Sequence, residues 1–300
     1  MAQAQRRLLA ARDAWATRPD VASVLRECDA LAGGCAFGAC PRLGRLMAGE
    51  GAQGFVDTWL NAMTQAWRDD PMAQLPFRHS HAGGTAIMHL YYAHRVTLAV
   101  MAVAPGVAEC PSTIAFTDCE RREIVLVGRG RATTYAFRTG AAPMTAEVAL
   151  GPGVRFRGDA RHSRVIESEG SPVVLLRLAC DPEVPGPTRE VEIASGRIVH
   201  RASASAADGR AELAALLLSA MGRTDAAPAL SAYAYGKAGE GARWQALRHA
   251  LAMDTGAGFA ALCTLASRAE DPLAVPASDL IDSLCTTYPQ LAHRRRLHAR

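Results

Sequence analysis

The spacing of apolar residues divides this chain of 300 residues into three zones. In the first zone, apolar side chains recur every three or four positions, which is the period of one helix face. Its clearest stripe consists of Phe55, Trp59, Met63 and Trp67. Such a stripe is typical of a helix that packs on a core. We therefore expect residues 1–76 to form an N-terminal helical segment.

In the second zone the apolar period shortens to two, the period of a β-strand, and glycine- or proline-containing turns separate the runs. Many short strands of this kind are typical of an antiparallel sandwich or barrel. No long helical pattern intervenes, which disfavours a parallel sheet. We expect this β domain over residues 77–201. Its expected strands are Ile87–Tyr92, Arg95–Val103, Thr113–Phe116, Glu123–Val127, Arg131–Phe137, Ala146–Leu150, Arg164–Ser168, Val173–Cys180, Glu190–Ile193 and Arg197–His200.

The helical period returns in the third zone, after a short run of small and polar residues that we interpret as a linker. We expect residues 202–300 to form a C-terminal helical segment, so that the whole chain has an α+β fold. The expected helices are Ala211–Met221, Ala242–Met253, Gly258–Ser267, Ala277–Cys285 and Gln290–Leu297.

Composition and charge exclude several classes of protein. No apolar run reaches the ~18 residues of a membrane helix, and arginines stand near the N-terminus where a signal peptide is apolar. We therefore expect a cytoplasmic protein with no membrane partner. The formal net charge is +4. No basic face with interleaved aromatic residues accompanies it, so we expect no nucleic-acid partner.

The chain contains eight cysteines, which we expect to be reduced thiols in a cytoplasmic protein. The spacing of Cys28, Cys35 and Cys40 is loose for a structural zinc site. Such a site usually combines a tight pair of cysteines with a second pair elsewhere. The role of these three thiols therefore stays open.

Two stretches of the strand zone resemble motifs of the cupin superfamily. Glu123–Gly130, with the sequence EIVLVGRG, looks like the family's glutamate followed by a strand and a glycine turn. Gly151–His162, with the sequence GPGVRFRGDARH, looks like the second cupin motif, which ends in a metal-binding histidine. The resemblance covers about a third of the chain. It implies a central cupin-like antiparallel β-barrel, or jelly roll, flanked by the two helical segments. It also implies His162 as a metal ligand.

The sequence departs from the cupin pattern just before Glu123. Metal-binding cupins carry an H-x-H pair there, whereas this chain has Thr117-Asp118-Cys119-Glu120. Acidic ligands with one histidine suit Fe(II) or Mn(II); the alternative is that the usual site has been lost. Cys119 lies among Arg121 and Arg122, and neighbouring arginines lower the pKa of a thiol. A buried structural cysteine is the alternative interpretation.

A further group of candidate ligands lies upstream of the strands. His79 and His81 would point to the same side of a strand, and two imidazoles on one face are half of an iron, copper or zinc site. His89, inside an apolar run, and His94 are weaker candidates. The order of elements is also similar to that of thiol dioxygenases, cupins that use iron and oxygen on a small thiol. Those enzymes take two of their three iron-binding histidines from the first motif, which lacks them in this chain. The resemblance therefore implies only His162 as a ligand.

The leading hypothesis is a non-heme, metal-dependent cupin-type oxygenase that acts on a small polar substrate, with Fe(II) as the expected metal. Arg155 and Arg157, together with Arg177, would clamp a substrate carboxylate if they face inward. The expected metal ligands are His162, His79 and His81, and the expected catalytic residues are Glu123 and Arg177.

Two alternatives stay open. One is a metal-free, cupin-like protein that binds a small ligand or has a regulatory role. The other is a metal-free isomerase or lyase in which Glu123 or His162 acts as general base. We also expect a homodimer, because the apolar strands Arg95–Val103 and Val173–Cys180 would expose apolar patches or edge groups unless helices cover them.

Overall fold

A computed structural model describes residues 2–68, 71–106, 111–183, 185–203 and 205–298. One of the eight cysteines, Cys110, lies outside these ranges. The chain divides into two compact units. The first, called the β unit here, consists of residues 1–185 and 190–199. The second, called the helical unit, consists of residues 186–189 and 200–300.

The β unit begins with helices, as the apolar stripes predict. They are α1 (Ala2–Ala16), α2 (Pro19–Ala32), the short 3₁₀ helix η1 (Phe37–Ala39), α3 (Pro41–Ala48) and α4 (Ala52–Arg68). Proline stands in the first turn of α2 and of α3, where its missing N–H would lack a helical partner in any case. Trp15 and Trp59 both pack edge-on against Phe77, which joins the helices to the chain leading into the first strand.

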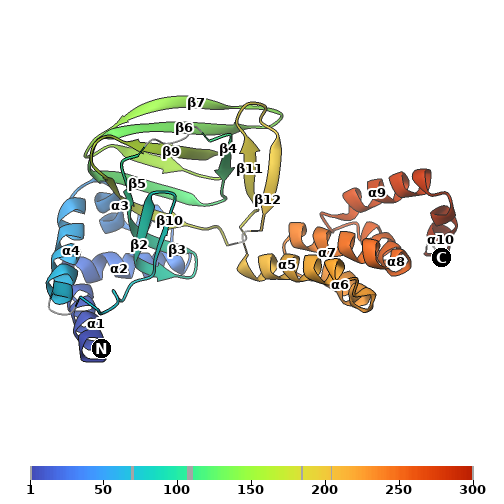
Figure 1. Cartoon of the computed structure of the whole chain (residues 1–300), viewed down its shortest axis with the longest axis horizontal. Coiled ribbons are helices and arrows are strands. Elements are labelled where there is room, and N and C mark those ends of the chain that lie inside the picture. Colours follow the sequence, from blue (N-terminus) through green and yellow to red (C-terminus); the bar gives the residue numbers. More distant parts are fainter. Residues whose placement is uncertain (1, 69–70, 107–110, 184, 204, 299–300) are drawn as a thin grey trace. The chain divides into compact units, whose positions relative to one another are not determined.

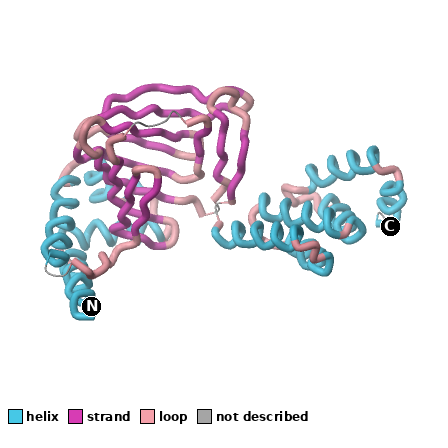
Figure 2. The backbone as a smooth tube through the Cα atoms, viewed as in Figure 1, coloured by secondary structure: helices cyan, strands magenta, loops and turns pink. Residues whose placement is uncertain are grey.

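The strands that follow form three sheets (Figures 1 and 2). The largest has the order β1 (His79–Ala82), β2 (Thr85–Ala93), β3 (Val96–Val103), β10 (Val173–Cys180), β5 (Glu120–Val127) and β8 (Arg155–Gly158). A second has the order β7 (Ala141–Leu150), β6 (Gly130–Arg138) and β9 (His162–Ser168). The third has the order β12 (Ile198–Ala202), β11 (Thr188–Glu192) and β4 (Thr113–Phe116).

The six-stranded sheet has one face toward the helices and one toward strands. Leu98, Leu176 and Ile124 belong to the same buried cluster as the side chains of α1–α4. Because side chains alternate along a strand, their neighbours point the other way. Leu175 and Val125 accordingly join a second cluster that includes residues of β6, β7 and β9. This second face carries the candidate site.

The glycine turn of the first cupin-like motif is required by its surroundings. Gly128 has a φ of 95°, and a Cβ at this position would lie 2.4 Å from the carbonyl oxygen of Pro172. Glycine alone adopts that conformation without strain and allows so close a backbone approach. The turn therefore holds the β5–β6 connection against the start of β10.

The α+β fold and the antiparallel strands between two helical regions are confirmed. Each strand predicted from the alternating pattern is present, although several begin or end at other residues. Strands β1 and β8 were not predicted, because β1 is exposed along its whole length and β8 has a single apolar residue between two exposed arginines. Closure is not confirmed: within the described ranges the strands form three separate sheets, and no closed barrel is found.

The helical unit contains α5 (Ala206–Ala220), η2 (Thr224–Ala226), α6 (Ala227–Ala234), α7 (Glu240–Met253), α8 (Thr255–Ala266), α9 (Ala274–Thr287) and α10 (Gln290–His298). Its core includes Leu247, Phe259 and Leu262, all fully buried. Among the described helices, none combines the length and the apolar composition that crossing a bilayer requires.

Candidate functional site

Five side chains form one row across the inner face of the six-stranded sheet. In order from β2 to β8, the directly paired residues are His89, Ala99, Arg177, Glu123 and Phe156. Directly paired residues of neighbouring strands share a face. The row therefore places two of the predicted site residues, Glu123 and Arg177, beside one another.

Glu123 binds two arginines at the same time. Its Oε1 accepts a hydrogen bond from Nε of Arg177 at 2.5 Å, and its Oε2 lies 2.5 Å from Nη2 of Arg164. Only 3% of Glu123 is exposed, so solvent screens neither contact well. Arg177 comes from the neighbouring strand β10, whereas Arg164 comes from β9 of the second sheet. Glu123 thus connects two sheets through charge.

Arg164 is poorly satisfied at this position. Its Nη2 is within ion-pair distance of Glu123, yet neither Nη2 nor Nε makes a hydrogen bond of acceptable geometry, and both atoms are buried. Burial lowers the pKa of Arg164; attraction by Glu123 opposes that effect, and repulsion from Arg177 and Arg121 adds to it. Its guanidinium group also lies 5.2 Å from the ring centroid of Phe156.

His89 stands at the other end of the row. Its Nδ1 is buried and has no hydrogen-bond partner, and its ring packs edge-on against Tyr92. Burial lowers the pKa of His89, and the positive charges of Arg78 and Arg177 lower it further. The neutral imidazole is therefore favoured at neutral pH. The sequence alone made His89 a weaker candidate metal ligand inside an apolar run and did not connect it with Arg177.

His162, the first expected metal ligand, is placed differently. Its side chain is about half exposed, at 54%, and its Nδ1 lies 2.7 Å from Oδ1 of Asp159. Only its backbone oxygen meets a group near Glu123, by accepting a hydrogen bond from Nη2 of Arg121. The structure therefore joins His162 to Asp159 and leaves its ring turned largely to solvent.

His79 and His81 lie on the edge strand β1 and are exposed. They share one face, as predicted, because His79 pairs with Met88 and His81 with Ala86. Met88 packs on the helix-side cluster, so this is the opposite face from the one that carries Glu123. The structure does not bring these two histidines to the row of Glu123.

The three arginines expected to clamp a carboxylate are also divided between the two faces. Arg155 and Arg157 of β8 are exposed. They pair with Ile124 and Arg122 of β5, on the face opposite to Glu123. Arg157 instead lies 3.1 Å from Glu120. Arg177 alone of these three lies on the inner face. Arg164, which the sequence analysis missed, takes the place of the other two.

A resident metal, which the cupin resemblance implies, does not fit these residues. Both carboxylate oxygens of Glu123 contact arginine, and the three expected histidines lie on β1 and at the exposed start of β9. Among the residues that the structure describes, no group of three or more His, Cys, Asp or Glu side chains is placed to hold a metal ion.

Cys119 agrees with the interpretation as a buried structural cysteine and not with that as a reactive thiol. It is buried, and burial together with hydrogen bonding to Asp181 raises its pKa to about 12, against a smaller lowering effect of Arg121. The effect of Arg121 has the predicted direction but does not determine the result. Cys119 is therefore a protonated structural thiol.

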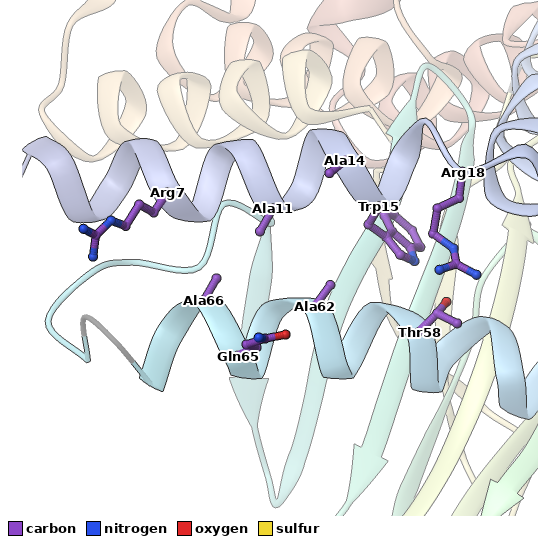
Figure 3. A pocket seen from close by; sticks show the side chains of 9 residues that line it. All are labelled: Arg7, Ala11, Ala14, Trp15, Arg18, Thr58, Ala62, Gln65 and Ala66. Carbon is purple, nitrogen blue, oxygen red and sulfur yellow. The ribbon is translucent and has the colours of Figure 1, made fainter.

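A separate groove of about 520 Å³ lies between α1 and α4 (Figure 3). The side chains of Ala11, Ala62 and Ala66 leave room between the two helices, and Arg7 and Arg18 stand toward its two ends. The groove is lined by residues of α1 and α4 and by Arg18, which lies between α1 and α2, and contains no residue of the row described above.

No protein-family model matches the chain, and no curated protein matches it. Solved structures do match part of it. The capsular polysaccharide assembling protein CapF from Staphylococcus aureus shares 12% identity, with a TM-score of 0.29, over 41% of this chain and 36% of that chain. A cupin superfamily protein from Desulfitobacterium hafniense shares 16% identity, with a TM-score of 0.25, over 34% of this chain and 83% of that chain.

A third match, the 7S globulin of Momordica charantia, shares 14% identity, with a TM-score of 0.29, over 40% of this chain and 36% of that chain. The chain therefore spans little more than a third of the length of CapF and of the globulin. Nothing about activity follows from matches of this extent.

Proposed function

We propose that this chain is a metal-free, cupin-like protein that binds a small polar ligand at the inner face of the β unit. The observation that carries the proposal is the double contact of Glu123 with Arg164 and Arg177. A metal ion at Glu123 would have to displace at least one of these arginines and would then lie beside an uncompensated positive charge. Electrostatic repulsion opposes that exchange.

The arrangement suits ligand binding. Arg177 and His89 are only partly buried, whereas Met101 and Leu175 on the same face belong to a buried apolar cluster. A site with one apolar wall and a few polar groups that point to a common place is typical of small-molecule binding. The ligand would meet charged donors held in place by Glu123.

The iron-dependent oxygenase is the competing hypothesis. It requires His162 to share a centre with Glu123 or with the β1 histidines, which needs a rearrangement of both strands. A metal-free isomerase or lyase requires a free general base. Glu123 is already bound to two guanidinium groups, and His162 to Asp159, so neither base is poised as it stands.

Elemental analysis of the full chain, purified without added metal and without chelator, tests the proposal. We expect iron, manganese, copper and zinc to be clearly substoichiometric, and EDTA to leave the melting temperature unchanged. The variant His162→Ala should have the same metal content and nearly the same melting temperature, since an exposed ion pair contributes about 0–1 kcal/mol. Stoichiometric metal that is lost in His162→Ala would overturn the proposal in favour of the oxygenase.

The homodimer remains a prediction, but the structure gives a different reason for it. Strands β3 and β10 each pair with a neighbour on both sides, and helices cover one of their faces, so they no longer motivate it. We propose that two copies meet at an exposed apolar stripe on α5 and the residue that caps it, formed by Leu213, Leu216, Leu217 and Met221.

A further inference from the structure

The region around Glu123 contains more positively charged groups than carboxylates to pair with them. Two guanidinium groups, those of Arg164 and Arg177, share this one side chain. Nη2 of Arg164 is in contact with Oε2 of Glu123, whereas Nε of Arg164 is buried and makes no hydrogen bond. A buried donor without an acceptor costs free energy, so such groups in folded proteins usually have a partner. The site is therefore short of an acceptor and of negative charge.

Further cationic groups extend the positive field along the same face. Arg121 lies close enough to Arg164 to repel it, and Arg78 and Arg177 act in the same way on His89. Nδ1 of His89 is buried and has no hydrogen-bond partner. One region thus receives positive charge or an unpaired polar atom from β2, β5, β9 and β10, and from the residue before β1. Convergence of one sign of charge favours an anion.

We infer that Arg164, Arg177 and His89, called the arginine cluster here, bind the carboxylate of a small organic acid. This inference rests on the proposed function, because it names the class of ligand that the same site takes. The bound acid would accept hydrogen bonds from guanidinium nitrogens that Glu123 leaves unsatisfied. Its charge would balance the second arginine.

The geometry of the cluster suits a carboxylate. The cluster already holds one carboxylate, that of Glu123, with Nε of Arg177 and Nη2 of Arg164 each 2.5 Å from one of its oxygens. Planar guanidinium groups match planar carboxylates in two-point contacts. Ala99 is the residue of the row between His89 and Arg177, so only a methyl group separates these two side chains within the sheet.

Calorimetric titration of the full chain with succinate tests the inference. Succinamide, which has the same shape without charge, and inorganic phosphate serve as comparison ligands at constant ionic strength. We expect succinate to bind and succinamide to bind at least about tenfold more weakly, because hydrogen bonds to charged groups are about twice as strong as neutral ones.

Variants assign the binding to the cluster. Arg177→Gln leaves Glu123 paired one-to-one with Arg164, so the fold should survive, and succinate affinity should fall by about tenfold or more. Arg177→Lys keeps the positive charge without the planar guanidinium group and should lose less succinate affinity than Arg177→Gln. The matched control is Arg157→Gln, an exposed arginine that is also paired with a glutamate but lies on the other face. Its succinate affinity should equal that of the unaltered chain.

Several results would overturn the inference: no heat from succinate at millimolar concentrations, equal binding of succinamide, equal loss in Arg157→Gln and Arg177→Gln, or tighter binding of phosphate than of succinate. Circular dichroism of each variant shows whether a lost affinity reflects unfolding. If Arg177→Gln is unfolded, the succinate affinity of Arg177→Lys is used in its place.

Metal content is measured separately. Stoichiometric metal overturns the proposed function whatever succinate does, and binding of the uncharged amide alone overturns the inference while the proposed function stands.

Discussion

Nη2 of Arg164 lies 2.5 Å from Oε2 of Glu123. This ion pair joins strand β9, in the sheet of β7, β6 and β9, to strand β5 of the six-stranded sheet. No backbone hydrogen-bond ladder links β5 with β9 in the described part of the chain. Next to the pair, Val125 and Ile166 belong to one buried cluster. The two sheets are thus held by apolar packing at one end and by charge at the other.

Removing the carboxylate of Glu123 should destabilise the β unit strongly. Glu123→Gln leaves Arg164 and Arg177 beside one another without a counter-charge, and loss of one partner of a buried ion pair costs about 3–5 kcal/mol. Glu120 offers a matched control, because it also contacts two arginines, Arg122 at 2.5 Å and Arg157 at 3.1 Å, but its side chain is 42% exposed.

Glu120→Gln should therefore cost less than about 1 kcal/mol. Urea unfolding followed by circular dichroism measures both values. Equal costs for the two variants would show that Glu123 does not act as a buried counter-charge.

The sequence predicts the strands better than the contacts between them. Long apolar runs identified β3 and β10, because their side chains are buried on both faces. Arg177, an arginine inside such a run, was expected in the site. Arg164 was missed, because a charged residue near the start of a strand also fits a solvated position. Its signal is the pattern Arg164, Ile166, Ser168, which puts the arginine on the inward face.

Motif resemblance located Glu123 but misplaced its partners. The second motif ends at His162, where the chain enters β9 with its ring exposed. The predicted same-face arrangement of His79 and His81 holds, yet the alternation of β1 alone does not say which face of the larger sheet they join. That choice depends on the pairing of His79 with Met88, a contact that a local pattern cannot supply.

The cysteines offer a direct test of burial. Cys119 is 7% exposed and its pKa is raised to about 12, whereas Cys35 is exposed. Because the thiolate is the reactive form, we expect iodoacetamide at pH 8 to modify Cys35 in the native chain and to modify Cys119 only after unfolding. Peptide mass spectrometry of samples taken over time measures both rates. Modification of Cys119 as fast as Cys35 in the native chain would contradict its placement.

The stripe on α5 tests the homodimer. Leu213, Leu216, Leu217 and Met221 are each more than half exposed, and they recur at the spacing of one helix face. Exposed apolar patches of this kind mark interaction sites, and self-complementary helix faces suit a two-fold dimer. We expect light scattering to give the dimer mass, and the double variant Leu213→Gln, Leu217→Gln to give the monomer mass with unchanged helicity. A monomer at all micromolar concentrations of the unaltered chain would refute the dimer.

The pH dependence of stability should carry a signature of His89. Its pKa in the folded chain is lowered by burial and by the charges of Arg78 and Arg177, so between that value and its ordinary value of 6.5 the unfolded chain binds more protons. Stability then rises with pH in this range. The contribution of the neutral imidazole is fully present above about pH 6.5 and is lost as the pH falls through the lowered pKa.

The variant His89→Gln lacks this group, so the difference in unfolding free energy between the unaltered chain and His89→Gln should shrink, or change sign, as the pH is lowered from neutral. His81→Gln, which alters an exposed histidine on β1, should show no such trend. Urea unfolding across this range measures the difference. A constant difference for His89→Gln would mean that the imidazole is as free to accept a proton in the folded chain as in the unfolded one. Because His89 would then be well solvated, the positive field assigned to the arginine cluster would not reach it.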